Sequence, residues 1–186
     1  MDTNNVVAYG SNAIVALHSG AALPSQFLTF MLGDEQYAVG ILHIKEIIEY
    51  CSLATVPMMP DCVRGVINLR GAVVPVMDLS ARFGRAQSLI GKRSCIVIVE
   101  AGGQDGECKQ VLGMLVDAVN AVVEIGAQDI EPAPSFGTRI RPDFIAGMGK
   151  LTDKNRGRFV ILLDIERVLS SEEIVGMARG STAGMA

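Results

Sequence analysis

The sequence contains no tryptophan and only two histidines, His18 and His43. Its six Phe and three Tyr are few for a surface that stacks nucleic-acid bases. A dense basic run is also missing, and the formal net charge is −4. The chain therefore has no electrostatic footprint for a phosphate backbone, and we expect no nucleic-acid partner.

Long apolar runs and paired cysteines are missing as well. The longest apolar stretches, such as 73–77 and 159–163, are far too short to span a bilayer, so we expect no direct membrane insertion. The N-terminus has no basic segment followed by an apolar core, which argues against export. The four cysteines show no Cys-x-x-Cys spacing, as expected for reduced packing residues. These features predict a cytoplasmic location.

Residue sets suited to catalysis are also missing. No cysteine or carboxylate pattern accompanies His43, so an ordinary solvated histidine explains it better than a metal ligand does. The sequence contains no nucleophile elbow. The glycine-rich stretches at 101–106 and 147–150 lack the spacing and the following helix of a phosphate-binding loop. We expect no enzymatic activity, metal or cofactor.

What the sequence does contain is an internal repeat. Residues 60–65 read Pro-Asp-Cys-Val-Arg-Gly, and residues 142–147 read Pro-Asp-Phe-Ile-Ala-Gly. Each block is followed by a short apolar stretch, an Arg-Gly pair, an apolar run and a step from Asp to an apolar residue. Self-similarity on this scale predicts two copies of one small structural unit.

Short strands and turns dominate the predicted elements. A hairpin is expected from 27–32 and 37–41, and a second one from 65–69 and 72–77 around a turn at Gly71. The spacing of Ile41, Ile44, Ile47 and Ile48 predicts a short helix between these hairpins. Asp78 is expected to cap a brief helix over 79–83.

The second copy follows the same plan. Strands are expected over 94–100 and 110–116, then a hairpin matching that of the first copy, a helix over 164–169 and a C-terminal helix from Ser171. The fold class is therefore mainly all-β, with two small barrels that remove exposed edges. We expect a flexible arm over 1–25, one domain over 26–175, and a C-terminal helix and tail over 170–186. The barrels are expected at about 26–84 and 93–169, with strand exchange between them possible.

Four residues are candidates for contact with other proteins. Arg70 lies at a hairpin tip, where a solvated turn arginine is the simpler alternative. Ile44 and Glu46 lie on the expected first helix, although such an Ile is more often in a core and such a Glu more often solvated. Phe136 ends a loop stiffened by Pro132 and Pro134, and either anchors an interface or folds back onto the barrel.

Several blocks together resemble the CheW-like family of bacterial chemotaxis coupling proteins. The most specific block is Gly-Val-Ile-Asn-Leu-Arg-Gly at 65–71, continuing as Ala-Val-Val-Pro-Val-Met-Asp-Leu to residue 79. The resemblance extends through 27–47, through Ile-Glu-Pro-Ala-Pro-Ser-Phe at 130–136, and through Val-Ile-Leu-Leu-Asp-Ile at 160–165. It covers about residues 26–175.

The resemblance implies two SH3-like, five-stranded barrels and an adaptor without enzymatic activity. The implied partners are the cytoplasmic tip of methyl-accepting chemoreceptors and the regulatory domain of the histidine kinase CheA. By position in the family's motifs, receptor binding is implied for Ile44, Glu46, Gly65 and Arg70. Gly65 opens its block, and its missing side chain would let a neighbour approach. Kinase binding is implied for Phe136.

A different class of function also has to be weighed. A small β-barrel can bind a small ligand, provided that it has a closed pocket with convergent polar groups. We find no set of residues in the sequence that would build such a pocket. A small-ligand-binding barrel therefore stands as the alternative to a coupling adaptor.

Overall fold

The computed structural model describes residues 25–102, 109–134, 137, 139–153 and 156–169. Several predicted features lie outside the described residues. They are the arm before residue 25, most of the turn at 102–107, the aromatic residue Phe136 and the C-terminal segment after residue 169.

Strands make up most of the described chain, and they are joined by short helical turns. The strands are β1 (Ser25–Leu32), β2 (Glu35–Gly40), β3 (Ile44–Glu49), β4 (Val63–Leu69), β5 (Ala72–Asp78), β6 (Cys95–Ala101), β7 (Gln110–Val116), β8 (Ala118–Ile125), β9 (Ile130–Glu131), β10 (Ile145–Asp153) and β11 (Arg156–Leu163). The helices are α1 (Leu79–Arg82), α2 (Ile165–Leu169) and the 3₁₀ turns η2 (Ile41–His43), η4 (Ala127–Asp129) and η5 (Pro142–Phe144). None of the helices in the described ranges could cross a bilayer.

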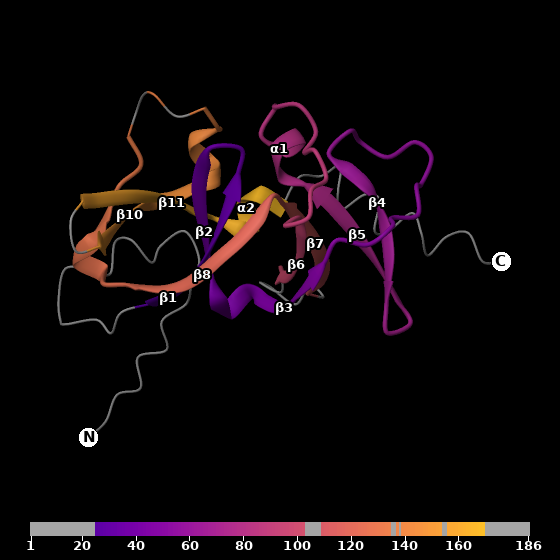
Figure 1. Ribbon diagram of the computed structural model, residues 1–186, viewed down its shortest axis with the longest axis horizontal. Coiled ribbons are helices and arrows are strands. Elements are labelled where there is room, and N and C mark those ends of the chain that lie inside the picture. Colours follow the sequence, from indigo (N-terminus) through magenta and orange to yellow (C-terminus); the bar gives the residue numbers. More distant parts are fainter. Residues whose placement is uncertain (1–24, 103–108, 135–136, 138, 154–155, 170–186) are drawn as a thin grey trace, which may run out of the picture.

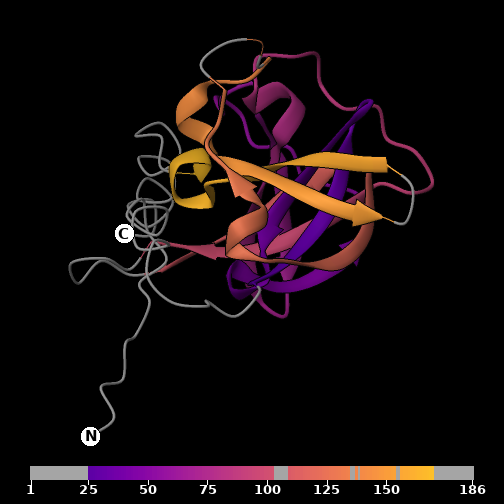
Figure 2. The same cartoon turned by 90° about the vertical axis from the view of Figure 1, so that its left-hand side faces the viewer.

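The strands form two sheets that lie side by side (Figure 1). The six-stranded sheet has the order β8-β1-β2-β11-β10-β9 and faces the viewer in Figure 2. The five-stranded sheet has the order β3-β6-β7-β5-β4. The predicted all-β fold class is therefore confirmed.

The sheets divide the chain differently from the contiguous halves 26–84 and 93–169. Strands β1 and β2 belong to the sheet that also holds β8 to β11, and β3 to β7 form the other sheet. Each sheet thus contains one repeated hairpin (β4–β5 or β10–β11) and one hairpin from outside the repeat (β6–β7 or β1–β2). A parallel pair joins the two hairpins of each sheet, β5 with β7 and β11 with β2. Both hairpins from outside the repeat are apolar, so the local sequence does not reveal with which of them a repeated hairpin pairs.

The expected helix over 41–48 is wrong beyond its first turn. Only η2 is helical, and the next six residues form β3, which pairs antiparallel with β6. Isoleucines at 44 and 48 fit a two-residue period as well as a helical one, and β-branched side chains favour a strand. A register shift between Ile44 and Glu46 lets β3 follow the curvature of the sheet.

The five-stranded sheet curls so that its two ends meet. The chain after β3 reaches Ala54, which forms a bridge with Val66 of β4 through two backbone hydrogen bonds of 2.9 Å. Strands β3 and β4 stand at opposite ends of the sheet order. The bridge therefore brings side chains from both ends onto one surface.

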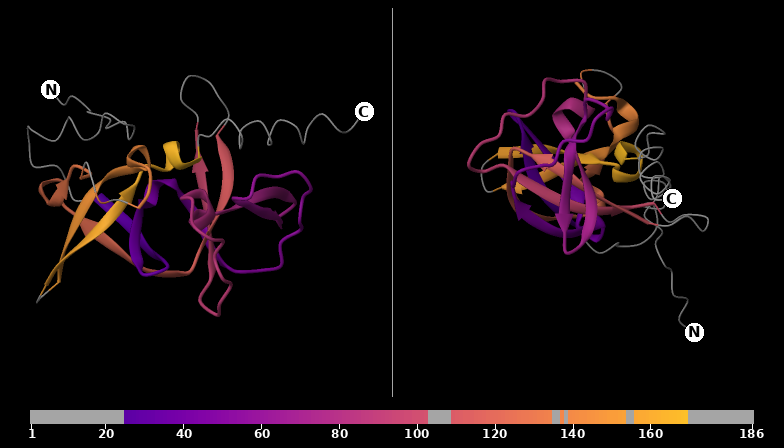
Figure 3. Two further views of the ribbon diagram at one scale, coloured as in Figure 1. Left: turned by 90° about the horizontal axis from the view of Figure 1, so that it is seen from above. Right: turned by 90° about the vertical axis from the view of Figure 1, so that its right-hand side faces the viewer.

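Three apolar clusters fill the molecule. One belongs to the five-stranded sheet and includes Ile67 and Ile96, and one belongs to the six-stranded sheet and includes Val160 and Leu162. The largest cluster takes side chains from both sheets and from both α-helices. Helix α2 accordingly lies between the two sheets in Figure 1 and in the left-hand view of Figure 3.

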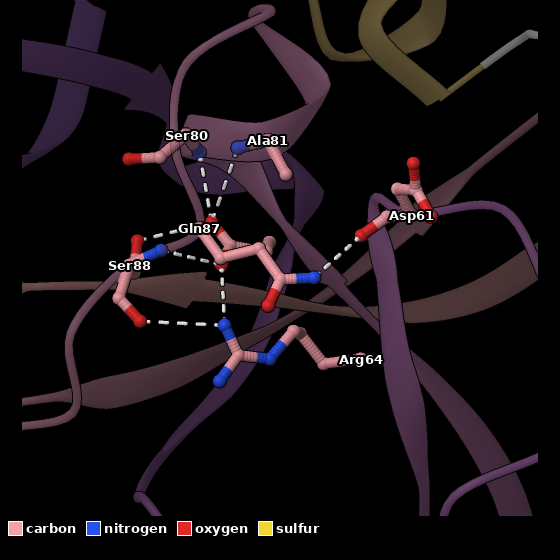
Figure 4. A network of polar contacts seen from close by, with 7 residues as sticks. Asp61, Arg64, Ser80, Ala81, Gln87 and Ser88 are labelled. Carbon is pink, nitrogen blue, oxygen red and sulfur yellow. Dashed lines mark hydrogen bonds and ion pairs between the residues drawn. The ribbon is translucent and has the colours of Figure 1, made fainter.

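A buried carboxylate fixes α1 and the connector after it to the five-stranded sheet. Asp78 has no exposed surface, and its Oδ1 accepts hydrogen bonds from the backbone N–H groups of Ser80 and Ala81, as predicted for an N-cap. Its Oδ2 accepts from the N–H of Ser88 at 2.7 Å and from Arg64 at 3.0 Å. Figure 4 shows these donors converging from three segments. One side chain thus ties the connector after α1 to β4.

Candidate partner-binding groove

The β4–β5 turn presents Arg70 to solvent. Arg70 has φ 52° and Gly71 has φ 88°, the pair of positive values that a tight two-residue hairpin turn requires. The N–H of Gly71 donates to Asn68 Oδ1 at 2.8 Å, which holds the turn in this shape. The Arg70 side chain is 78% exposed. The predicted hairpin and its exposed arginine are therefore confirmed.

Arg70 is paired across the curled sheet with Glu46 of β3. Its two terminal nitrogens donate to the two carboxylate oxygens of Glu46, each at 2.9 Å. An exposed pair of this kind adds at most about 1 kcal/mol to stability. Its clearer effect is geometric, because a bidentate contact fixes both charges at one place on the surface.

An open groove of about 680 Å³ runs beside this ion pair. Three of the four residues predicted to bind a receptor, Ile44, Glu46 and Arg70, line it together. The remaining lining residues are Leu42, His43, Lys45, Leu69, Ala72, Val73, Val74, Glu100 and Val111. The turn and the strand that the sequence separates by some two dozen residues thus contribute to one surface.

Apolar side chains form much of the groove wall. Leu42 of η2 is 75% exposed and Val73 of β5 is 69% exposed. Ile44 is half-buried and also packs against the large shared cluster, so it belongs both to the core and to the groove. Exposed apolar side chains beside fixed charges are the composition of a protein-contact surface rather than of a catalytic site.

A second charged group lies at the groove. The carboxylate of Glu100 accepts hydrogen bonds from Lys45 at 2.9 Å and from Lys109 at 3.4 Å. The hydrogen bond from Lys45 lowers the pKa of Glu100 below its ordinary value, against a smaller effect of burial, and Lys109 lowers it further. Within the described residues, no group of three or more His, Cys, Asp and Glu side chains is placed to hold a metal ion.

Gly65 occupies a different position from the other three predicted residues. It is buried and has φ 149°, and a Cβ there would lie 2.5 Å from the carbonyl oxygen of Ala54. The neighbour that approaches Gly65 in the structure is therefore the chain's own segment after β3. This contact gives the glycine a role in closing the sheet. Phe136 lies outside the described residues.

Sequence reasoning missed Leu42, Val73 and the Lys45–Glu100 contact. A two-residue period in β5 places Val73 and Pro75 on the face opposite Val74 and Val76, which is a usable signal for Val73. Leu42 carried no such signal, because it was assigned to a longer helix. The contact with Glu100 depends on the pairing of β3 with β6, and local sequence does not reveal that pairing.

Comparison with known proteins now adds to this geometry. The family model described as the CheW-like domain matches residues 26–173. The chain belongs to the CheW-like domain family. The chemotaxis protein CheW of Klebsiella aerogenes is 37% identical over 162 residues, which cover 87% of this chain and 92% of that protein. CheW of Rhizobium meliloti is 32% identical over 148 residues, covering 80% and 89%.

A solved structure agrees with both the fold and the family. The crystal structure of the scaffolding protein TtCheW from Thermoanaerobacter tengcongensis matches with a TM-score of 0.69 and 32% identity. The match covers 84% of this chain and 94% of that one. The resemblance inferred from the 65–79 block is thereby confirmed. The predicted function of a chemotaxis coupling adaptor is supported by these CheW relatives, and the alternative of a small-ligand barrel has no support.

Proposed function

We propose that this CheW-like chain couples the cytoplasmic tip of methyl-accepting chemoreceptors to the histidine kinase CheA, without enzymatic activity of its own. The observation that carries the proposal is the groove, where Ile44, Glu46 and Arg70 lie together beside exposed apolar side chains. In this proposal the protein works in the cytoplasm and is recruited to receptor arrays. It needs neither a metal nor a cofactor.

The groove suits a helical partner. An amphipathic helix buries its apolar stripe against side chains such as Leu42 and Val73, while charges at the rim fix its orientation. The Glu46–Arg70 pair supplies both signs of charge at that rim. A receptor tip is made of helices, so its apolar face would occupy the groove and its polar residues would meet the pair.

The kinase would use a separate surface. Phe136 is proposed to contact the regulatory domain of CheA, from a loop that Pro132 and Pro134 restrict. Two weak contacts on one adaptor gain strength from each other, since binding at one site raises the effective concentration at the other. Receptor signalling then shifts the kinase between its states through the geometry of the bound adaptor.

The receptor site is tested by affinity measurements with a receptor cytoplasmic fragment. Arg70→Ala and Glu46→Ala should each weaken binding by about tenfold, because each removes one member of the charge pair that a docked helix would meet and leaves the other member without its partner. Their circular dichroism and melting temperatures should stay close to those of the parent protein, since the ion pair is exposed.

The matched control is Arg158→Ala. Arg158 is also exposed, but it lies on β11 of the other sheet, remote from the groove. Its replacement should leave receptor affinity unchanged. Unchanged affinity in both groove variants, or an equal loss in the control, would contradict the assignment of the groove to the receptor.

A further inference from the structure

Two clusters of charged side chains lie at the groove, and they differ in net charge. Arg70 and Glu46 match each other, since two N–H donors meet two carboxylate oxygens. At the second group, Lys45 and Lys109 share the single carboxylate of Glu100. An ammonium group has three donors, and among the described residues each of these lysines uses one of them on Glu100. The second group therefore has donors and positive charge to offer a partner.

The exposure of these side chains supports such a contact. The Lys45 and Lys109 side chains are 47% and 64% exposed, whereas the side chain of Glu100 is only 28% exposed. The carboxylate is thus less accessible than the two ammonium groups. Lys45 and Glu100 both line the groove, so a group that docks there reaches Lys45, with Lys109 beside Glu100.

The position of Lys45 relative to the ion pair sets the kind of partner group. Lys45 and Glu46 are consecutive residues of β3, and the register shift between Ile44 and Glu46 interrupts the usual alternation of faces. Both side chains therefore line the same groove. A helix that buries apolar residues in the groove and meets Arg70 would carry further side chains past Lys45. Two ammonium groups share one carboxylate here, so the surplus positive charge is best matched by a carboxylate among these side chains.

We propose that Lys45, held by Glu100, is a specificity-determining residue that binds an acidic side chain of the helical partner in the groove. The inference rests on the proposed function, because the partner is the receptor helix. It adds a second recognition point beside Arg70, with Lys109 supporting it. Glu100 is the internal competitor of the partner's carboxylate, and on docking the partner shares the lysines with it.

The test measures binding of a receptor cytoplasmic fragment at low and at physiological salt. Lys45→Glu should weaken binding by about tenfold at low salt and by less at high salt, since rim charges act through screened attraction. Glu100→Gln should have the opposite effect and raise the affinity by about two- to fivefold, because it removes the carboxylate that competes with the partner for the lysines. A purely structural role for Glu100 would not produce tighter binding.

The matched control is Lys150→Glu. Lys150 pairs with Glu131 at 2.5 Å on the other sheet, and its side chain is 43% exposed, close to the value for Lys45. Its replacement should leave binding unchanged. Melting temperatures of all variants establish that each is folded.

The outcomes separate this inference from the proposed function. If Arg70→Ala weakens binding while Lys45→Glu leaves it unchanged, the groove binds the receptor and the acidic contact is refuted. If Glu100→Gln binds the receptor fragment more weakly, the acidic contact at Lys45 is also refuted. Glu100 would then support binding instead of competing with the partner's carboxylate. If neither Arg70→Ala nor Lys45→Glu has an effect, the proposed function itself fails.

Discussion

Single residues at the groove serve two separate purposes. Arg70 and Glu46 contribute little to folding, because their ion pair is exposed, and they are free to serve a partner. Gly65, in the same sequence block as Arg70, is buried away from the groove lining and allows the carbonyl of Ala54 to approach. The 65–71 block therefore contains one residue that is proposed to contact a partner, Arg70, and one that lets the two ends of the five-stranded sheet meet, Gly65.

Gly65→Ala should destabilise the fold. The added Cβ would meet the Ala54 carbonyl at 2.5 Å, and φ 149° is rarely adopted by residues with a side chain. We expect the free energy of unfolding to fall by about 2 kcal/mol in urea denaturation. Gly91→Ala is the control, because a Cβ there has no neighbour within 4 Å. Equal stability of the two variants would contradict the closure role.

The residues of the candidate site were largely accessible from the sequence, but their arrangement was not. Arg70 and its turn follow from local chemistry, since Asn-Leu-Arg-Gly specifies a tight hairpin. The meeting of Arg70 with Glu46 depends on the bridge between Ala54 and Val66, which joins distant segments. Local patterns do not encode such a contact, so the groove became visible only in the folded chain.

At the scale of elements, the repeat is preserved in the two capped helices. Asp78 precedes α1, as predicted for a cap, and Asp164 precedes α2, one residue before the observed start of the helix that was expected over 164–169. Each follows a repeated hairpin. The two aspartates differ in their surroundings. Asp78 is fully buried and also binds Arg64 and Ser88, whereas the side chain of Asp164 is 17% exposed and accepts from the backbone N–H of Arg167.

Asp78→Asn should cost far more stability than Asp164→Asn. The amide nitrogen of Asn would face N–H donors of Arg64 or Ser88, which leaves donors unsatisfied in a buried place. We expect a loss of about 3 kcal/mol at position 78. At position 164 the loss should stay below about 1 kcal/mol, because an Asn oxygen still accepts from the Arg167 N–H and only an exposed ion pair is lost. Chemical denaturation of both variants measures the difference, and equal losses would contradict a special role of the buried network.

One element prediction failed, and one arrangement that the sequence left open was decided by distant pairing. The expected helix at 44–48 became β3, and β1 and β2 joined the sheet of β8 to β11, an exchange of strands that the sequence left possible. In both cases the apolar pattern is real, but it fits two arrangements equally well. The choice is made by pairing with β6 and β11, which lie some 50 or more residues away along the chain. Turns and caps were predicted correctly because their interactions are local.

At the scale of the whole molecule, the two sheets are held as one unit. Glu35 of β2 accepts hydrogen bonds from Tyr37 and from Arg85, which lies between α1 and β6 of the other sheet. Tyr37 in turn contacts Phe83, and Phe83 contacts Phe144, with ring centroids 5.6 and 5.9 Å apart. A polar contact and a row of aromatic rings therefore connect the sheets.

This contact predicts an acid-sensitive part of the stability. Burial acts to raise the pKa of Glu35, but the hydrogen bonds from Tyr37 and Arg85 and the charges of Arg85 and Arg139 outweigh it, so the pKa is lowered. A lowered pKa gives stability that is complete above the unfolded value of about 4.3 and is lost as the pH falls through the folded value. The advantage of the parent protein over Glu35→Gln should therefore shrink in acid.

Urea denaturation of the parent protein and of Glu35→Gln at several pH values between about 3 and about 7 measures this difference. Glu124→Gln is the control, because Glu124 accepts only an exposed hydrogen bond from Gln26 among the described contacts. A stability difference for Glu35→Gln that stays constant across the pH range would contradict the contact between the sheets.

The central claim is that one molecule binds receptor and kinase at the same time. Co-sedimentation of this chain with receptor cytoplasmic fragments and CheA, with kinase activity followed as the chain is added, tests it most directly. We predict that both partners sediment together and that kinase activity comes under receptor control. Arg70→Ala should lose the receptor, and Phe136→Ala should lose the kinase while keeping the receptor. If kinase and receptor sediment independently at every concentration of the folded protein, the account is contradicted.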